Sequence, residues 1–147
     1  MNLSKAEYSE LTKQASPNSK SYKTIPSAFL IGGLICVIGQ LLLTLYQNAG
    51  MNEDTAGTVV SITLIALSAI LTGLNVYDNI AKVGGAGTLV PITGFANAVV
   101  SPALEFKAEG YVLGLGAKMF IIAGPVIVYG MLASAIYGVI LWIISLF

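Results

Sequence analysis

The chain has 147 residues, and its seven lysines and seven acidic residues give a formal net charge of zero at pH 7. Apolar residues make up 56% of the sequence and charged residues 10%, and the mean hydropathy is +0.84, whereas an average soluble domain carries roughly 25% charged residues. This composition predicts an all-α integral membrane protein, and the neutral charge gives no reason to expect a nucleic-acid partner. Histidine is absent, which removes the commonest general base and metal ligand. We therefore expect neither an enzyme nor a metal or cofactor site.

Residues 1–24 form a polar N-terminal segment that contains four of the seven lysines. We expect a short helix over about 5–15. Because lysines collect on the cytoplasmic side of membrane spans, this segment is predicted to be cytoplasmic. The remaining residues, 25–147, constitute the expected membrane domain.

Three stretches of the membrane domain are long and apolar enough to be transmembrane helices: 25–47, 56–77 and 118–146. The first has 23 residues, and a helix of that length is roughly 34 Å long, enough for a hydrocarbon core of about 30 Å. Tyr77 is expected at a membrane interface, where tyrosines are enriched. Small residues that would let another helix approach closely recur in the first and last spans. They are Gly32, Gly33, Gly39, Gly130, Ser134 and Gly138.

The hydrophobic stretch 84–104 is least able to form one uninterrupted helix. It holds four glycines, two prolines and several polar side chains. Non-helical backbone at membrane depth needs protein or water around it, which favours a broken or re-entrant segment beside a polar pathway. A kinked spanning helix packed against its neighbours is the alternative. If the segment is re-entrant, all seven lysines lie on the cytoplasmic side, so the positive-inside rule favours three spans plus one broken half-membrane element.

This segment also supplies the candidate functional residues. Helices are expected to begin near Thr93-Gly94 and at Ser101-Pro102, and helix N-termini present free N–H groups that favour anions. The predicted pore or anion-binding residues are Thr88, Thr93, Gly94, Asn97 and Ser101. The predicted gating hinge comprises Gly84, Gly85, Gly87, Pro91 and Pro102. The predicted mouth charges are Asp78, Glu105, Lys107 and Glu109, for which solvated interface charges are the alternative interpretation.

Two stretches of the sequence resemble a known family. The run LTGLNVYDNIAKVGGAGTLVPITGFANAVVSPALEFKAEGYVLGLGAKMF, residues 71–120, and AFLIGGLICVIGQ, residues 28–40, resemble the stage V sporulation membrane proteins of the AC and AE type. The motif VPITGFAN at 90–97, with its flanking GGAG and SPALEFKAEG, is the most specific part. The resemblance covers nearly all of the chain beyond the N-terminal tail.

The resemblance implies a protein of the inner membrane of the forespore and spore. It implies a channel that moves dipicolinic acid, with calcium, during sporulation and germination and that responds to membrane tension. It also implies the stage V sporulation proteins AD and AE as partners. Three or four membrane elements are too few for a wide pore, so we expect a homo- or hetero-oligomer. A non-conducting membrane scaffold that anchors a soluble dipicolinate-binding partner is the alternative function.

Overall fold

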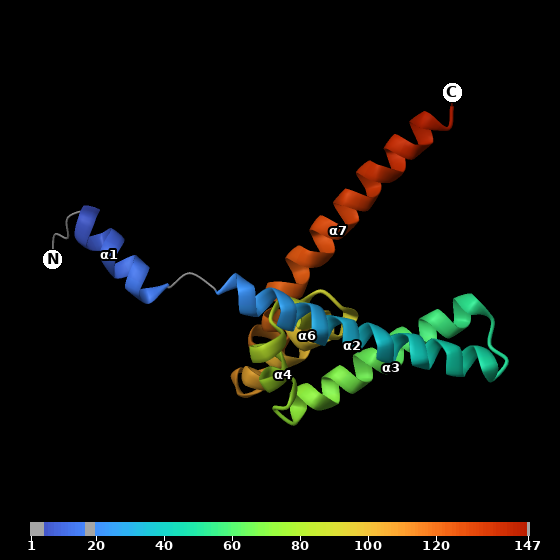
Figure 1. Cartoon of the computed structure of the whole chain (residues 1–147), viewed down its shortest axis with the longest axis horizontal. Helices are drawn as coiled ribbons and strands as arrows, with labels where there is room; N and C mark the ends of the chain where they lie inside the picture. The colour runs from blue at the N-terminus through green and yellow to red at the C-terminus, as the bar shows by residue number, and fades with distance from the viewer. Residues whose placement is uncertain (1–4, 17–19, 147) are drawn as a thin grey trace.

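The computed structural model describes residues 5–16 and 20–146, and this part of the chain is built from helices joined by short turns (Figure 1). Three of its helical stretches are long and apolar enough to cross a membrane, which confirms the predicted all-α membrane fold with three spans. The elements are α1 (Lys5–Ala15), α2 (Ser21–Asn48), α3 (Glu53–Gly73), α4 (Tyr77–Gly84), α5 (Ala86–Leu89), α6 (Ile92–Glu105), η1 (Lys107–Glu109), η2 (Tyr111–Gly116) and α7 (Ala117–Ile144).

The helices α2 and α3 form an antiparallel hairpin that is closed by residues 49–52 (Figure 1). The Asn52 side chain accepts a hydrogen bond from the Thr55 N–H at 2.9 Å and so caps the first turn of α3. Along the hairpin, the Tyr46 hydroxyl lies 2.9 Å from Oγ1 of Thr63. The helix α2 begins four residues before the predicted span, and Pro26 lies in its second turn.

The end of α3 differs from the predicted span, which continued to Tyr77. The helix ends at Gly73, and Asn75 takes a left-handed conformation with φ of +57°. Asparagine tolerates this conformation better than most residues, so a turn forms here. The turn directs Tyr77 inward as the first residue of α4, with only 4% of its surface exposed. The place of Tyr77 at a membrane interface stays a prediction, but its burial among the helices was not expected.

The buried side chains gather mainly where α3 meets the short helices α4, α5 and α6. This core mixes small apolar residues with polar ones. Its members are Leu64, Ser68, Thr72, Tyr77, Thr88, Thr93 and Ala96. Such a polar core fits a membrane domain, in which water does not drive the apolar side chains together and hydrogen bonds contribute to helix association.

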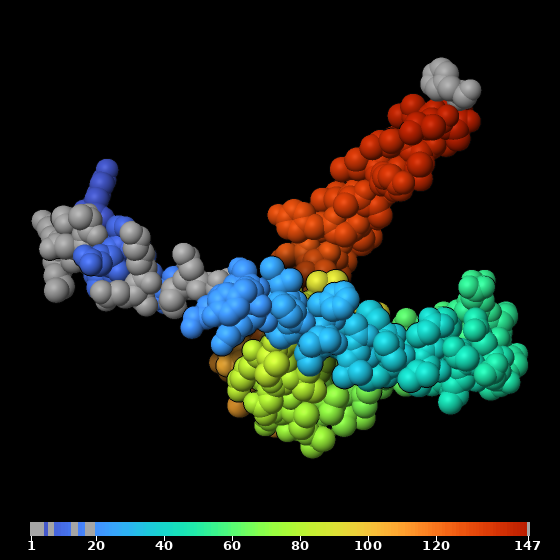
Figure 2. Space-filling view, viewed as in Figure 1, coloured from blue at the N-terminus to red at the C-terminus, as the bar shows by residue number. Residues whose placement is uncertain are grey.

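The last helix, α7, leaves this core. Its first turns pack on α6 and η2, and Ala123 there is completely buried. From Val126 onward every described residue is exposed, and the helix projects away from the other elements (Figures 1 and 2). A Cβ added to Gly130 or Gly138 would meet nothing within 4 Å, so these two small residues of α7 contact no other element of the described chain.

Candidate functional site

The predicted broken segment, residues 84–104, is interrupted at two points. The first break is Gly85, whose φ of +48° ends α4. The second is Pro91, whose extended conformation, with ψ of 161°, separates the four-residue α5 from α6. The predicted broken segment is confirmed, and both breaks fall on residues predicted to be hinges.

Two hydrogen bonds show how the broken segment runs relative to α3. The Ser68 hydroxyl donates to the Thr93 carbonyl oxygen at 2.6 Å, and the Thr72 hydroxyl lies 2.9 Å from Oδ1 of Asn97. Ser68 and Thr72 are four residues apart on α3, and their partners Thr93 and Asn97 are four residues apart on α6. The later residue of α3 contacts the later residue of α6, so the two helices run in the same direction. Since α6 runs parallel to α3, the chain enters the core after Tyr77, reaches the level of Ser68 and returns toward the end of α3 where it entered.

The level of Ser68 also corresponds to the middle of α2. Ile35, Ser68 and Thr93 line one cavity, and Ile35 lies at the midpoint of α2. The broken segment therefore reaches about halfway along the longest helix of the hairpin. This is the course expected of a re-entrant half-membrane element.

The five predicted pore residues do not share one environment. Thr88, Thr93 and Gly94 are buried, whereas Asn97 and Ser101 are half-buried. The Thr88 hydroxyl donates to the Gly85 carbonyl at 2.8 Å, and a Cβ on Gly94 would overlap the carbonyl oxygens of Thr88 and Leu89. In this conformation the buried polar groups bind one another and do not line an open passage.

Sequence reasoning missed the residue that connects these groups. The Tyr77 hydroxyl lies 2.8 Å from the Thr88 carbonyl oxygen and 3.0 Å from Oγ1 of Thr93. It therefore contacts both sides of the Pro91 break. Local sequence gives one signal for this role, the Asn75 turn that separates Tyr77 from α3. The buried hydroxyl groups of Ser68 and Thr72 lie in the predicted span 56–77 and were not among the predicted site residues.

The predicted hinge glycines divide into two kinds. Gly85 has the left-handed backbone that a hinge or turn requires. Gly87 instead permits close packing, because a Cβ there would overlap the carbonyl group of Ala28 on α2. Gly84 is buried and also packs closely, since a Cβ there would lie 2.8 Å from the Ile31 side chain. Of these, only Gly85 lies at a break in the backbone.

The prediction of a helix start at Ser101-Pro102 is wrong. Pro102 lies inside α6, which continues to Glu105. A proline inside a helix removes the hydrogen bond to the residue four positions earlier and crowds that residue's carbonyl. The packing of α6 against both α3 and α7 holds the helix together despite this cost. The single helix start in this region is at Ile92, next to the predicted Thr93-Gly94.

The predicted mouth charges are exposed side chains at one end of the core. Asp78, Glu105, Lys107 and Glu109 are all exposed, and they lie at the end of the core where α3 and α6 finish. Nearby, the Lys118 ammonium lies 4.6 Å from the centre of the Phe106 ring. Within residues 5–16 and 20–146, no group of three or more acidic or cysteine side chains is placed to hold a metal ion.

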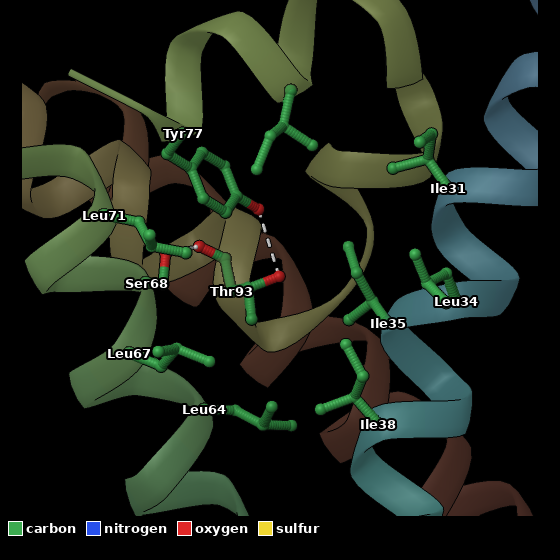
Figure 3. A pocket seen from close by; sticks show the side chains of 11 residues that line it. Ile31, Leu34, Ile35, Ile38, Leu64, Leu67, Ser68, Leu71, Tyr77 and Thr93 are labelled. Atoms are coloured by element: carbon green, nitrogen blue, oxygen red, sulfur yellow. Dashed lines mark hydrogen bonds between the residues drawn. The ribbon is translucent and has the colours of Figure 1, made fainter.

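A cavity of about 140 Å³ separates α2 from α3 next to the broken segment (Figure 3). The hydroxyl groups of Tyr77 and Thr93 meet at one side of it, and aliphatic side chains of the two long helices form the other sides. Those side chains are Ile31, Leu34, Ile35, Ile38, Leu64, Leu67 and Leu71. The buried polar side-chain atoms of the described residues all have hydrogen-bond partners, so nothing in the cavity wall requires a water molecule.

Comparison with known proteins identifies the family. The family model described as SpoVAC/SpoVAEB sporulation membrane protein matches residues 24–140, which include the broken segment and nearly all of the three spans. The chain belongs to this family. It is also 47% identical over 137 residues to the stage V sporulation protein AC of Bacillus subtilis (strain 168), covering 92% of this chain and 91% of that protein. No solved structure matches this SpoVAC/SpoVAEB family chain.

Proposed function

We propose that this sporulation membrane protein is a subunit of a channel that moves dipicolinic acid, together with calcium, across the inner membrane of the forespore and spore. The proposal rests on one structural observation: the broken, polar segment that folds back beside α3 inside an otherwise apolar helical domain. Family membership supports the sporulation context. Transport would be inward during sporulation and outward during germination.

The chemistry of the broken segment suits a doubly charged aromatic anion. Dipicolinate carries two carboxylates, and hydrocarbon alone could not accept them because burying an unpaired charge is prohibitive. Backbone N–H groups freed at the Pro91 break, together with Asn97 and Ser101, could replace part of the hydration shell. A permeant ion must also leave, so a passage without strongly attracting fixed cations is suitable. The exposed Glu105 and Glu109 carboxylates offer oxygen ligands for calcium at the mouth.

We further propose that the passage forms between subunits and opens when the broken segment moves. Thr88 and Thr93 are closed off by their own hydrogen bonds in this conformation. The exposed length of α7 offers a surface for another subunit, either a second copy or the AE protein. Membrane tension is the proposed stimulus, because tension favours any rearrangement that enlarges the area of the protein in the membrane.

The deciding experiment traps dipicolinate in liposomes that contain only this purified protein and measures release before and after an osmotic downshock. We expect release on downshock that protein-free liposomes do not show. Release before any downshock would indicate a pore whose gate needs a partner. No release from folded, inserted protein would overturn the proposal for the isolated chain.

One observation favours a second candidate function, a non-conducting scaffold that anchors the soluble AD protein. The buried hydroxyls of the core already bind one another, as a purely structural core would require. If liposomes with this chain alone release nothing, AD and AE would be added in turn. Binding of AD without any release from the three-protein liposomes would support the scaffold function.

A further inference from the structure

The bonds of Tyr77 are unusual because they connect the two sides of a break. Thr88 belongs to α5 and Thr93 to α6, and Pro91 lies between them. In a continuous helix the Thr88 carbonyl would accept the N–H of residue 92, but the extended conformation of Pro91 prevents this. The Tyr77 hydroxyl, 2.8 Å away, supplies the missing donor.

This replacement matters at membrane depth. A carbonyl group without a donor in hydrocarbon costs several kcal/mol, so the broken conformation requires a substitute donor. Tyr77 and Thr88 are 4% and 1% exposed, so water does not provide one. In the closed position, the Thr88 carbonyl therefore depends on one side-chain hydroxyl for its hydrogen bond.

The cavity gives these groups room to move. Protein interiors are normally packed too closely for a large side chain to change position without cost. Here a space of about 140 Å³ borders both Tyr77 and Thr93 (Figure 3). The walls of this space are mainly aliphatic, and it is partly open because Leu34, Ile38 and Leu67 in its wall are exposed. The space could thus receive the displaced Tyr77 ring or the Thr93 side chain.

We propose that Tyr77 is the latch of the broken segment: its hydroxyl holds α5 and α6 in the closed conformation, and the neighbouring cavity accepts the side chains when the latch opens. This inference rests on the proposed function, because the segment that the latch holds is the proposed gate. It assigns to Tyr77 the control of opening and assigns no contact with the permeant.

The test compares three variants. Tyr77→Phe removes the latch hydroxyl and keeps the ring. Tyr46→Phe is the matched control, because the Tyr46 hydroxyl also binds a threonine hydroxyl, that of Thr63 at 2.9 Å, but between α2 and α3 and away from the broken segment. Ile35→Phe enlarges a side chain of the cavity wall and is expected to oppose opening.

The first measurement is amide hydrogen exchange of residues 86–97 in lipid nanodiscs, which reports local opening without any transport. Interhelical hydrogen bonds in membranes correspond to about a threefold change in an equilibrium on average and about seventeenfold at most. We expect exchange in this segment to rise within that range in Tyr77→Phe, to stay at the wild-type rate in Tyr46→Phe and to fall in Ile35→Phe. Unchanged exchange in Tyr77→Phe, or an equal rise in Tyr46→Phe, would overturn the latch.

The second measurement is dipicolinate release from liposomes over a series of downshocks. With the latch removed, release should begin at a milder downshock, and Ile35→Phe should require a stronger one. Faster exchange in Tyr77→Phe with no release from any variant would support the latch and overturn the proposal that the isolated chain forms a channel. Release from the wild type with the same threshold and the same exchange in Tyr77→Phe would support the channel and overturn the latch. The Thr93→Val variant, which removes one of the two contacts, serves if Tyr77→Phe does not fold.

Discussion

The broken segment and α7 both lie in the membrane domain, yet they differ in composition, in length and in how they pack. The broken segment is short and rich in glycine and polar atoms, and it packs its threonines against α3 and α2 while Leu89 and Val90 at its tip stay exposed. The helix α7 is 28 residues long, apolar on every side, and exposed from Val126 onward. An apolar helix with all its backbone bonds made internally can face lipid at little cost, whereas interrupted backbone cannot. The hydrogen-bonding side chains of the core therefore gather around the break.

The same residue types occur in both regions, so matched substitutions can measure this difference. We pair a glycine, a proline and a serine of the core around the break with a residue of the same type in α7. The expected effects decrease from the glycine pair to the serine pair.

The glycine pair is Gly87 and Gly130. Gly87→Leu should prevent normal folding, because even a Cβ would overlap the Ala28 carbonyl, and overpacking costs about 1–3 kcal/mol or more. A Cβ on Gly130 meets no atom within 4 Å, so Gly130→Leu should leave the fold intact. Size-exclusion chromatography and thermal unfolding in detergent would measure both. Equal losses in the two variants would contradict the packing assigned to Gly87.

The proline pair is Pro91 and Pro125. Pro91→Ala restores an N–H at the break and lets α5 and α6 join, which shifts the balance toward a continuous helix by up to about 3 kcal/mol. We expect a changed downshock threshold for dipicolinate release with normal insertion into the membrane. Pro125 lies within a helix that is already continuous. The Pro125→Ala variant should therefore release dipicolinate at the same downshock threshold as the wild type. An unchanged threshold in Pro91→Ala would argue against a gate at this break.

The serine pair is Ser68 and Ser134. Ser68 donates to the Thr93 carbonyl at 2.6 Å in the core, whereas exposed Ser134 donates to the Met131 carbonyl of its own helix at 3.0 Å. Ser68→Ala should lower the free energy of unfolding by about 0.6 kcal/mol, and by about 1.7 kcal/mol at most. Ser134→Ala should change it by less than about 0.5 kcal/mol. Denaturation in detergent would separate the two, and a larger loss in Ser134→Ala would contradict the comparison.

Much of the fold could be predicted from local sequence. Length and hydropathy predicted the three long helices. Glycine and proline predicted the interruptions at Gly85 and Pro91, because these residues change the backbone at their own positions. Pro102 shows the limit of that reasoning. It lies in α6 without ending it, since contacts with α3 and α7 outweigh a local preference.

The candidate site could be predicted in its location but not in its hydrogen bonds. The threonines of the broken segment were expected to face a passage, and they are instead buried in bonds with Tyr77 and with backbone carbonyls. Which way a hydroxyl points depends on how distant helices pack, and a single sequence does not contain that information. The burial of Tyr77 was not predicted, because it depends on the turn at Asn75.

The most direct measurement concerns the path of the broken segment, on which the proposed gate depends. In a Cys36→Ser background, single cysteines would replace the exposed residues Lys23, Glu53 and Lys107, and intact cells would be treated with a membrane-impermeant maleimide. A re-entrant segment predicts labelling at position 53 and protection at positions 23 and 107 until the cells are permeabilised. Labelling at positions 53 and 107 together, with protection at 23, would mean that residues 84–104 cross the membrane, and the re-entrant gate would have to be abandoned.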